Sequence, residues 1–195
     1  MSRARALCEI TGAVLYMAAN GRVVHPYSPV SDGDRLSVGG LGVAVLSTPG
    51  HTHESVCYLV EDLYLLSGDT LFIEGIGRPD LERGQTGMDE SAAQLHDSLY
   101  ERLFRLPPSL RVFPGRTGPE ISFDGVVVEA SLGTLRDRVE LLGADRVEFT
   151  ARIKERLAAP PPNYRHIIMV NEGKLDLDLL SAIELEAGSN RCAIA

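Results

Sequence analysis

The stretch from Ser47 to Leu81 decides the fold, and it reads S-T-P-G-H-T-H-E-S-V-C-Y-L-V-E-D-L-Y-L-L-S-G-D-T-L-F-I-E-G-I-G-R-P-D-L. His51 follows a Pro-Gly turn, and Asp69 ends an apolar run. Histidine and aspartate both bind metal ions, and open coordination sites are commonly built where neighbouring strands end. The pattern therefore predicts that His51 and Asp69 lie together as two metal ligands.

Each of these residues also has an ordinary structural alternative. A lone histidine in a loop is most often solvated or bonded to the backbone. Asp69 stands between Gly68 and Thr70, which is typical of a turn or a helix cap. A buried carboxylate is nevertheless costly unless a cation accompanies it, so the two residues together favour the metal interpretation.

Outward from this stretch, apolar runs and turn signals predict the other elements. Strands are expected at residues 13–18, 35–38, 42–47, 56–60, 63–66 and 110–113, and helices at residues 3–10, 88–106, 145–158 and 163–170. The strands at 56–60 and 63–66 are nearly continuous apolar runs, so we expect both of their faces to be buried. Residues 117–130 are expected to form a loop with a short hairpin. Strands first and helices later predict a layered α/β sandwich.

The composition is that of one soluble domain spanning residues 1–195, with residues 160–195 as a C-terminal extension that packs on its surface. A net charge of −8 argues against a nucleic-acid partner and leaves small molecules as the expected partners. No apolar run is long enough to span a membrane, and the N-terminus has no signal-peptide pattern. The cysteines, Cys8, Cys57 and Cys192, are widely spaced and odd in number, so we expect a cytoplasmic protein without a disulfide framework.

Three further residues near the central stretch invite a chemical interpretation. His53 follows His51 by two positions, but the intervening turn favours a side chain that points away from the metal pair. Arg78 could bind a substrate carboxylate through its guanidinium, or could form an internal ion pair with Asp80. Cys57 lies inside a strand, where a core thiol is the favoured interpretation over a nucleophile.

Taken together, the motifs T-P-G-H-T-x-x-S, G-D-T-L-F and G-x-G-R-P-D-L resemble the metallo-β-lactamase-fold superfamily. The resemblance is closest to the branch of persulfide dioxygenases, with glyoxalase II as a near relative. It extends to V-F-P-G-R at residues 112–116, to P-P-N-Y at 161–164 and to N-R-C at 190–192. The fold that this implies is an αββα sandwich, incomplete at its N-terminal half.

The resemblance also implies site residues and a reaction. His51 matches a histidine ligand, Asp69 matches the aspartate ligand, and Arg78 matches an arginine near the thiol-substrate pocket. In persulfide dioxygenases such residues belong to a two-histidine, one-carboxylate Fe(II) site with open positions. The implied reaction oxidises glutathione persulfide with O2 to sulfite and glutathione, whereas the implied hydrolase alternative would use Zn.

One departure from the family pattern concerns the motif H-x-H-x-D-H. Only His51 and His53 have its opening spacing, and Ser55 and Val56 stand where aspartate and histidine are required. The family carries this motif upstream of the segment that corresponds to residues 2–12, so we expect the chain to be truncated at its N-terminus. His53 could then serve as an improvised third ligand for the pair.

The other departure is Arg116, which stands where the family has a later histidine. A guanidinium has no free lone pair and cannot bind a metal ion. In the two-zinc hydrolases that histidine is a second-site ligand, so the substitution disfavours a dinuclear hydrolase. Two remaining ligands also fall short of the three or four that zinc sites use.

Three functions therefore stay open for this chain. The first is a persulfide-dioxygenase-like enzyme, impaired or inactive in the chain as it stands. The second is a vestigial binding protein that holds no metal, and the third is a thioester hydrolase of glyoxalase II type. A truncated sheet would expose an edge and apolar surface, so we also expect poor solubility or self-association, and a homo-oligomer stays open.

Overall fold

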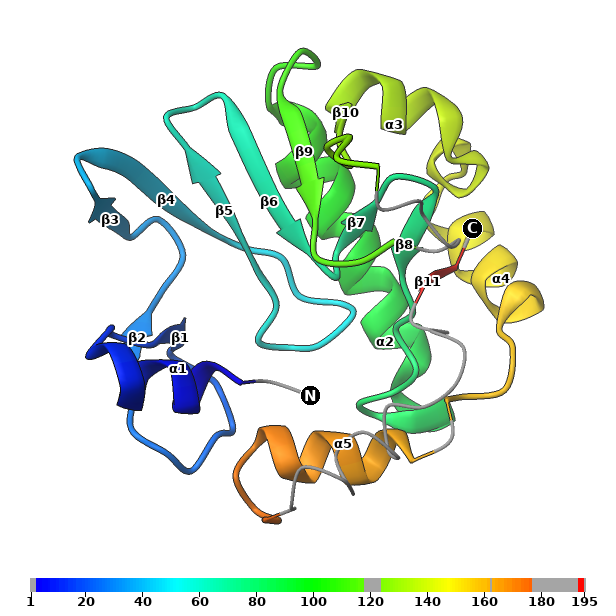
Figure 1. The fold of residues 1–195 in the computed structure, drawn as a ribbon. Helices are drawn as coiled ribbons and strands as arrows, with labels where there is room; N and C mark the ends of the chain where they lie inside the picture. The colour runs from blue at the N-terminus through cyan, green and yellow to red at the C-terminus, as the bar shows by residue number, and fades with distance from the viewer. Residues whose placement is uncertain (1–2, 118–123, 162, 177–192, 195) are drawn as a thin grey trace.

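The computed structural model describes residues 3–117, 124–161, 163–176 and 193–194 (Figure 1). The strands are β1 (Tyr16–Ala18), β2 (Ser28–Val30), β3 (Arg35–Val38), β4 (Leu41–Ser47), β5 (Val56–Val60), β6 (Tyr64–Gly68), β7 (Leu71–Phe72), β8 (Gly75–Gly77), β9 (Arg111–Pro114), β10 (Ala130–Ser131) and β11 (Ala193–Ile194). The helices are α1 (Ala4–Thr11), α2 (Gly84–Asp97), α3 (Leu132–Arg138), α4 (Arg146–Arg156) and α5 (Tyr164–Asn171). Three short segments complete the list, namely a π-helix, η1 (Ser98–Arg102), and two 3-10 helices, η2 (Leu103–Arg105) and η3 (Glu140–Gly143).

A six-stranded sheet with the order β10-β9-β6-β5-β4-β3 forms the centre of the fold (Figure 1). Its strands pair antiparallel except for β6 and β9, which run parallel. Both β4 and β6 are antiparallel to β5, so they run in the same direction and end at the same edge of the sheet. The segments that follow these two strands therefore start from one edge.

One face of this sheet carries the core. Cys57, Leu59, Leu65 and Val112 share that face by register and are at most 7% exposed. They pack in one cluster with helical side chains, which are Ala92, Leu95, Leu99, Leu103, Leu132, Leu135, Phe149 and Ile153. Removal of this apolar surface from water is the main stabilising contribution of the core.

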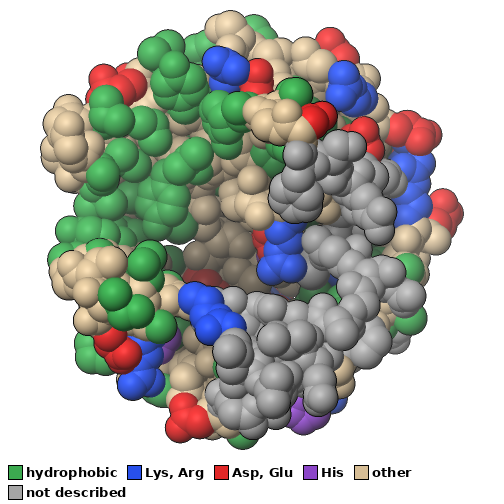
Figure 2. Space-filling model, in the orientation of Figure 1, with side chains coloured by type: hydrophobic (Ala, Val, Ile, Leu, Met, Phe, Trp, Pro, Cys, Tyr) green, Lys and Arg blue, Asp and Glu red, His purple; other side chains and the backbone are tan. Residues whose placement is uncertain are grey.

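The opposite face of the sheet is only partly covered. By register it carries Val38, Leu41, Tyr64 and Leu66, which are between 38% and 60% exposed. Hydrophobic side chains gather at the upper left of the molecule, over the strands β4, β5 and β6 (Figure 2). The prediction that both faces of β5 and β6 are buried is therefore wrong, because the residues of this face are half-buried in β5 and Tyr64 and Leu66 are exposed in β6.

The long helix predicted over residues 88–106 is broken into three parts. Its leucines at 95, 99 and 103 face the core as expected. The α-helix α2 ends at Asp97, however, and η1 and η2 complete the segment. Ser98 donates a hydrogen bond of 2.7 Å from its hydroxyl to the carbonyl oxygen of Pro49, and this tertiary contact lies at the start of the π-helix.

The other expected elements have mixed outcomes. The N-terminal helix is confirmed, and Gly12 ends it with a left-handed φ of 71°. The helix predicted from residue 145 is confirmed as α4, with Asp145 as its cap through bonds to two backbone N–H groups. Helix α3 and the short strands β2, β7, β8, β10 and β11 were not predicted. The proposed hairpin overlaps residues 118–123, and half of the predicted C-terminal extension also lies outside the described residues. Among the residues that are described, no helix is both long and apolar enough to cross a membrane.

Candidate metal centre

His51 and Asp69 come together at the edge where β4 and β6 end. His51 follows β4 through Gly50, whose φ is +143°. A Cβ atom on Gly50 would lie 2.4 Å from the Cβ of Leu95, so only glycine allows this approach to α2. Asp69 follows Gly68, the last residue of β6, which has a φ of +54°. Both loops thus depend on glycines that the sequence marks as turns.

The orientation of His51 is that of a metal ligand. Its Nδ1 lies 2.8 Å from the carbonyl oxygen of Arg78. A carbonyl oxygen only accepts, so Nδ1 donates this hydrogen bond, and Nε2 is the ring nitrogen that is left to face a metal ion. That Nε2 faces Asp69 Oδ2 at 3.6 Å, and both side chains are largely buried. A histidine that donates one ring N–H to a backbone carbonyl and turns the other nitrogen to a metal is the usual arrangement in metalloproteins.

Arg116 shares the carboxylate of Asp69. Its Nε lies 3.0 Å from Oδ2, the same oxygen that faces His51. Arg116 stands in the loop after β9, the strand that pairs with β6. The donor types and the histidine orientation fit a metal ion, but they give two ligands beside a positive charge, whereas catalytic zinc sites usually have three protein ligands.

Arg78 is held inside the protein. It is 2% exposed and forms two hydrogen bonds with the carboxylate of Asp80, at 2.7 and 2.9 Å. Its guanidinium also reaches the carbonyl oxygens of Ala158 and Ala159, at 2.8 and 3.4 Å. The internal ion pair, one of the two alternatives from the sequence, is therefore present, and a substrate role for Arg78 stays a prediction.

His53 contacts a different set of residues. Its ring nitrogens face Glu54, Glu82 and the carbonyl oxygen of Asn20. Among the described residues, His53, Glu54 and Glu82 form the one group of three metal-type side chains whose ligand atoms lie within 4.8 Å of one another. The sequence analysis missed this group, because Glu82 lies 29 residues from His53 and no spacing rule connects them.

Hydrogen bonds between buried polar side chains connect the loops that follow β4 and β6. The hydroxyls of Thr48 and Thr70 lie 3.0 Å apart, and the thiol of Cys57 is 3.3 Å from the Thr48 hydroxyl. Burial raises the pKa of Cys57 to about 11, against a smaller lowering by its hydrogen bonds to the two threonines. Cys57 is fully buried, so the core-thiol interpretation is confirmed.

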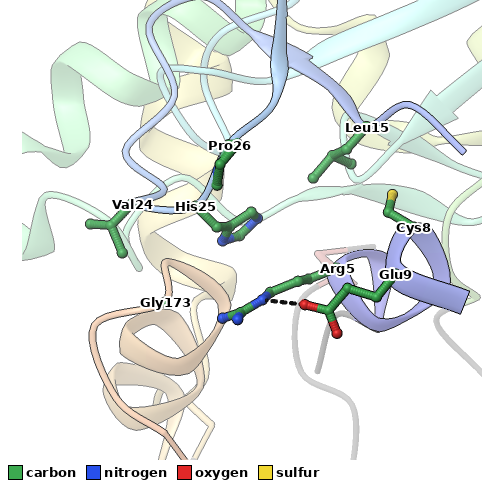
Figure 3. Close-up of a pocket in the computed structure, with 8 residues that line it drawn as sticks. All are labelled: Arg5, Cys8, Glu9, Leu15, Val24, His25, Pro26 and Gly173. Carbon is green, nitrogen blue, oxygen red and sulfur yellow. Dashed lines mark hydrogen bonds and ion pairs between the residues drawn. The ribbon is translucent and has the colours of Figure 1, made fainter. Parts of the chain in front are cut away.

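A cavity of about 480 Å³ lies elsewhere, between α1 and the segment before β2 (Figure 3). Arg5, Cys8 and Glu9 line it from α1, and His25 lines it from the facing segment. Arg5 and Glu9 form an ion pair of 2.9 Å across one turn of the helix. Neither His51 nor Asp69 lines this cavity, so it is separate from the candidate metal centre.

A largely antiparallel sheet with a histidine and an aspartate at neighbouring strand ends defines an α/β protein with a candidate metal site at one edge of the sheet. The family model of the metallo-beta-lactamase superfamily matches residues 4–116, so the chain belongs to that superfamily. This confirms the family and the fold that the motifs at His51 and Asp69 predict.

Curated and solved relatives agree with this assignment. The chain is 33% identical over 164 residues to a hydroxyacylglutathione hydrolase of Pseudomonas aeruginosa, which is 80% of this chain and 60% of that protein. It is 28% identical over 134 residues to the mitochondrial persulfide dioxygenase ETHE1 of Bos taurus, which is 68% of this chain and 48% of that protein. The solved structure of ETHE1 from Myxococcus xanthus has a TM-score of 0.73 and 31% identity, and the match covers 90% of this chain and 72% of that chain. The chain thus spans about half the length of the curated relatives it matches.

Proposed function

We propose that this protein acts on a glutathione-derived persulfide at the His51–Asp69 pair, and that the 195-residue chain turns it over slowly. The names of its relatives support a glutathione-derived substrate, since both a hydroxyacylglutathione hydrolase and a persulfide dioxygenase are among them. The reaction would convert glutathione persulfide, O2 and water to glutathione, sulfite and two protons. We place it in the cytoplasm, because the described cysteines, Cys8 and Cys57, are free thiols.

The observation that carries this choice is the contact between Arg116 and Asp69. A second zinc ion of a hydrolase would need a neutral or anionic ligand there, and a guanidinium is neither. A positive charge beside Asp69 also repels a second cation. A mononuclear site tolerates the arginine better, so oxidation is favoured over thioester hydrolysis.

His51 and Asp69 would hold an Fe(II) ion, with Zn as the alternative. When bound, the iron would supply the redox chemistry that O2 requires to oxidise the persulfide sulfur. The chain's own residues orient the ligands. The Arg78 carbonyl fixes the ring of His51. The buried guanidinium of Arg78 stabilises the loop that carries this carbonyl through its ion pair with Asp80. A direct substrate role for Arg78 would require a substrate carboxylate to take the place of Asp80.

A metal-free binding protein is the second candidate, and the same contact favours it. Arg116 already gives Asp69 a positive partner at 3.0 Å, so the carboxylate is not left as an isolated charge. In this alternative the pair would bind a thiol compound without turnover.

Paired assays of the iron-loaded chain separate these functions. With glutathione persulfide, we expect O2 uptake and sulfite in equal amounts, at a rate that the Asp69→Asn variant loses. With S-lactoylglutathione, we expect a rate of hydrolysis no higher than that of the Asp69→Asn variant. Hydrolysis that depends on Asp69 would reassign the protein to the thioester hydrolases. If neither activity is observed and the protein binds no metal, the metal-free binding protein is the function that these assays support.

A further inference from the structure

We infer that the cavity between α1 and the segment before β2 binds a small zwitterionic thiol compound, and that Cys8 holds this compound through a disulfide. Oxidised glutathione is the compound of this class that tests the inference. The cavity volume of about 480 Å³ lies within the roughly 300–1,000 Å³ of small-molecule sites. The inference does not depend on the proposed function, because neither His51 nor Asp69 lines this cavity.

The first step is the arrangement of side chains on α1. Arg5, Cys8 and Glu9 are spaced by three and four residues, so they lie on one face of the helix, and all three line the cavity. This face therefore presents a cation, a thiol and an anion to one ligand. Figure 3 shows the ion pair of Arg5 and Glu9 on the helix side of the cavity, with Cys8 nearer to Leu15.

The second step is the opposite wall, which offers polar and apolar contacts. His25 lines the cavity from the segment before β2, together with Val24 and Pro26. An imidazole can both donate and accept hydrogen bonds, as the peptide groups of a short peptide require. The residues that follow α5 hold this wall in place. The backbone N–H of Val24 donates to the carbonyl oxygen of Glu172 at 2.9 Å, and a Cβ atom on Gly173 would lie 3.3 Å from Nδ1 of His25.

The third step is the match of charges. A free amino-acid end carries a carboxylate and an ammonium group side by side, so it can pair with Arg5 and Glu9 without adding net charge to the cavity. The ion pair of 2.9 Å between these two residues is exposed, with 64% and 63% of their side chains accessible. Exposed pairs contribute little to stability, so the charges of a ligand can replace this pair at small cost. A simple anion or an uncharged thiol would use only part of these groups.

The fourth step is the exchange reaction that attaches the ligand. Cys8 is a free, half-buried thiol at the cavity, whereas Cys57 is fully buried. The thiolate of Cys8 would attack one sulfur of the disulfide in oxidised glutathione, form a new S–S bond and release one glutathione thiolate. This released thiolate takes up the proton that Cys8 loses, so the exchange needs no further oxidant.

The test compares the rates at which the chain reacts with two disulfides, oxidised glutathione and the uncharged hydroxyethyl disulfide. Intact-protein mass spectrometry measures the rates, and peptide mapping identifies the cysteine. We expect one glutathionyl group on Cys8 and none on Cys57. Arg5→Gln should slow the reaction with oxidised glutathione by about two- to fivefold, as expected when one exposed ion pair is lost. Its reaction with hydroxyethyl disulfide should stay unchanged.

Arg3→Gln is the matched control, because Arg3 is exposed and is not among the residues that line the cavity. Melting curves identify a variant that folds poorly, and Glu9→Gln then replaces Arg5→Gln. Absence of the adduct on Cys8 would overturn the inference. Equal slowing of both disulfides in Arg5→Gln, or no slowing of either, would also overturn it, because Cys8 would then be an accessible thiol without a binding site around it.

Discussion

Arg116 Nε lies 3.0 Å from Asp69 Oδ2, the oxygen that also faces Nε2 of His51 at 3.6 Å. One oxygen of Asp69 thus lies between the guanidinium of Arg116 and the candidate metal ligand His51. The guanidinium and a metal ion would compete for this oxygen and repel each other. The affinity of the pair for metal therefore depends on Arg116.

Removal of this guanidinium should strengthen metal binding. In a His53→Ala background, which leaves only the pair, Arg116→Ala should raise Fe(II) affinity by about tenfold or more, because the repulsion between two cations is relieved. Anaerobic titration measures the affinity, and Arg105→Ala is the matched control, since Arg105 pairs with Glu101 away from the site. An unchanged affinity in Arg116→Ala would show that the ion pair does not oppose the metal.

The close approach of Gly50 to Leu95 predicts a sensitive position in the His51 loop. An added Cβ would lie 2.4 to 2.6 Å from Leu95 atoms, two of them in the backbone, and φ at Gly50 is +143°. Gly50→Ala should therefore cost about 2–4 kcal/mol in the free energy of unfolding. Urea denaturation measures this cost. Gly143→Ala should stay within about 0.5 kcal/mol, because nothing lies within 4 Å of its Cβ position. Similar costs at both positions would contradict the packing argument.

Cys57 should resist alkylation in the native protein. Burial raises its pKa to about 11, so the thiolate is about a thousandth of the population at pH 8 and grows as the pH rises. Cys8 is only half-buried and should react first. Peptide mass spectrometry after iodoacetamide treatment, with and without urea, distinguishes the two. Fast native labelling of Cys57 at pH 8 would contradict its place in the core.

The partly covered face of the sheet should promote self-association. Leu66 is 43% exposed on β6, beside other apolar side chains of that face. Leu66→Lys should therefore lower the average mass in light scattering, because a charge interrupts the apolar surface. The control is Val147→Lys, since Val147 is 81% exposed on α4, away from the sheet. A wild-type protein that is already a monodisperse monomer would contradict this prediction.

Turn residues and apolar runs predict the parts of the fold that depend on local structure. The turn glycines before His51 and Asp69, and the apolar runs of β4, β5 and β6, predict the juxtaposition of that pair. Both faces of β5 and β6 could not be assigned in the same way, because burial depends on what packs on the sheet. The helix predicted through residue 106 breaks after Asp97, where Ser98 bonds to Pro49, a contact that no local pattern contains.

The residues of the candidate site could be predicted only where they belong to a recognisable sequence motif. His51 and Asp69 stand in motifs that resemble the superfamily. The group around His53 includes Glu82, which lies 29 residues further along the chain and contacts His53 only in the folded structure. The ion pair between Arg116 and Asp69 likewise joins segments that only the pairing of β6 with β9 places together.

The most direct test of the central claim is an anaerobic Fe(II) titration of the His53→Ala chain, with and without Asp69→Asn. The account predicts one Fe(II) per chain, with binding at least about tenfold weaker after Asp69→Asn, because a neutral amide then replaces the anionic carboxylate of the pair. Binding that is equally strong in both chains, or absent from the chain that retains Asp69, would contradict the assignment of His51 and Asp69 as the metal centre.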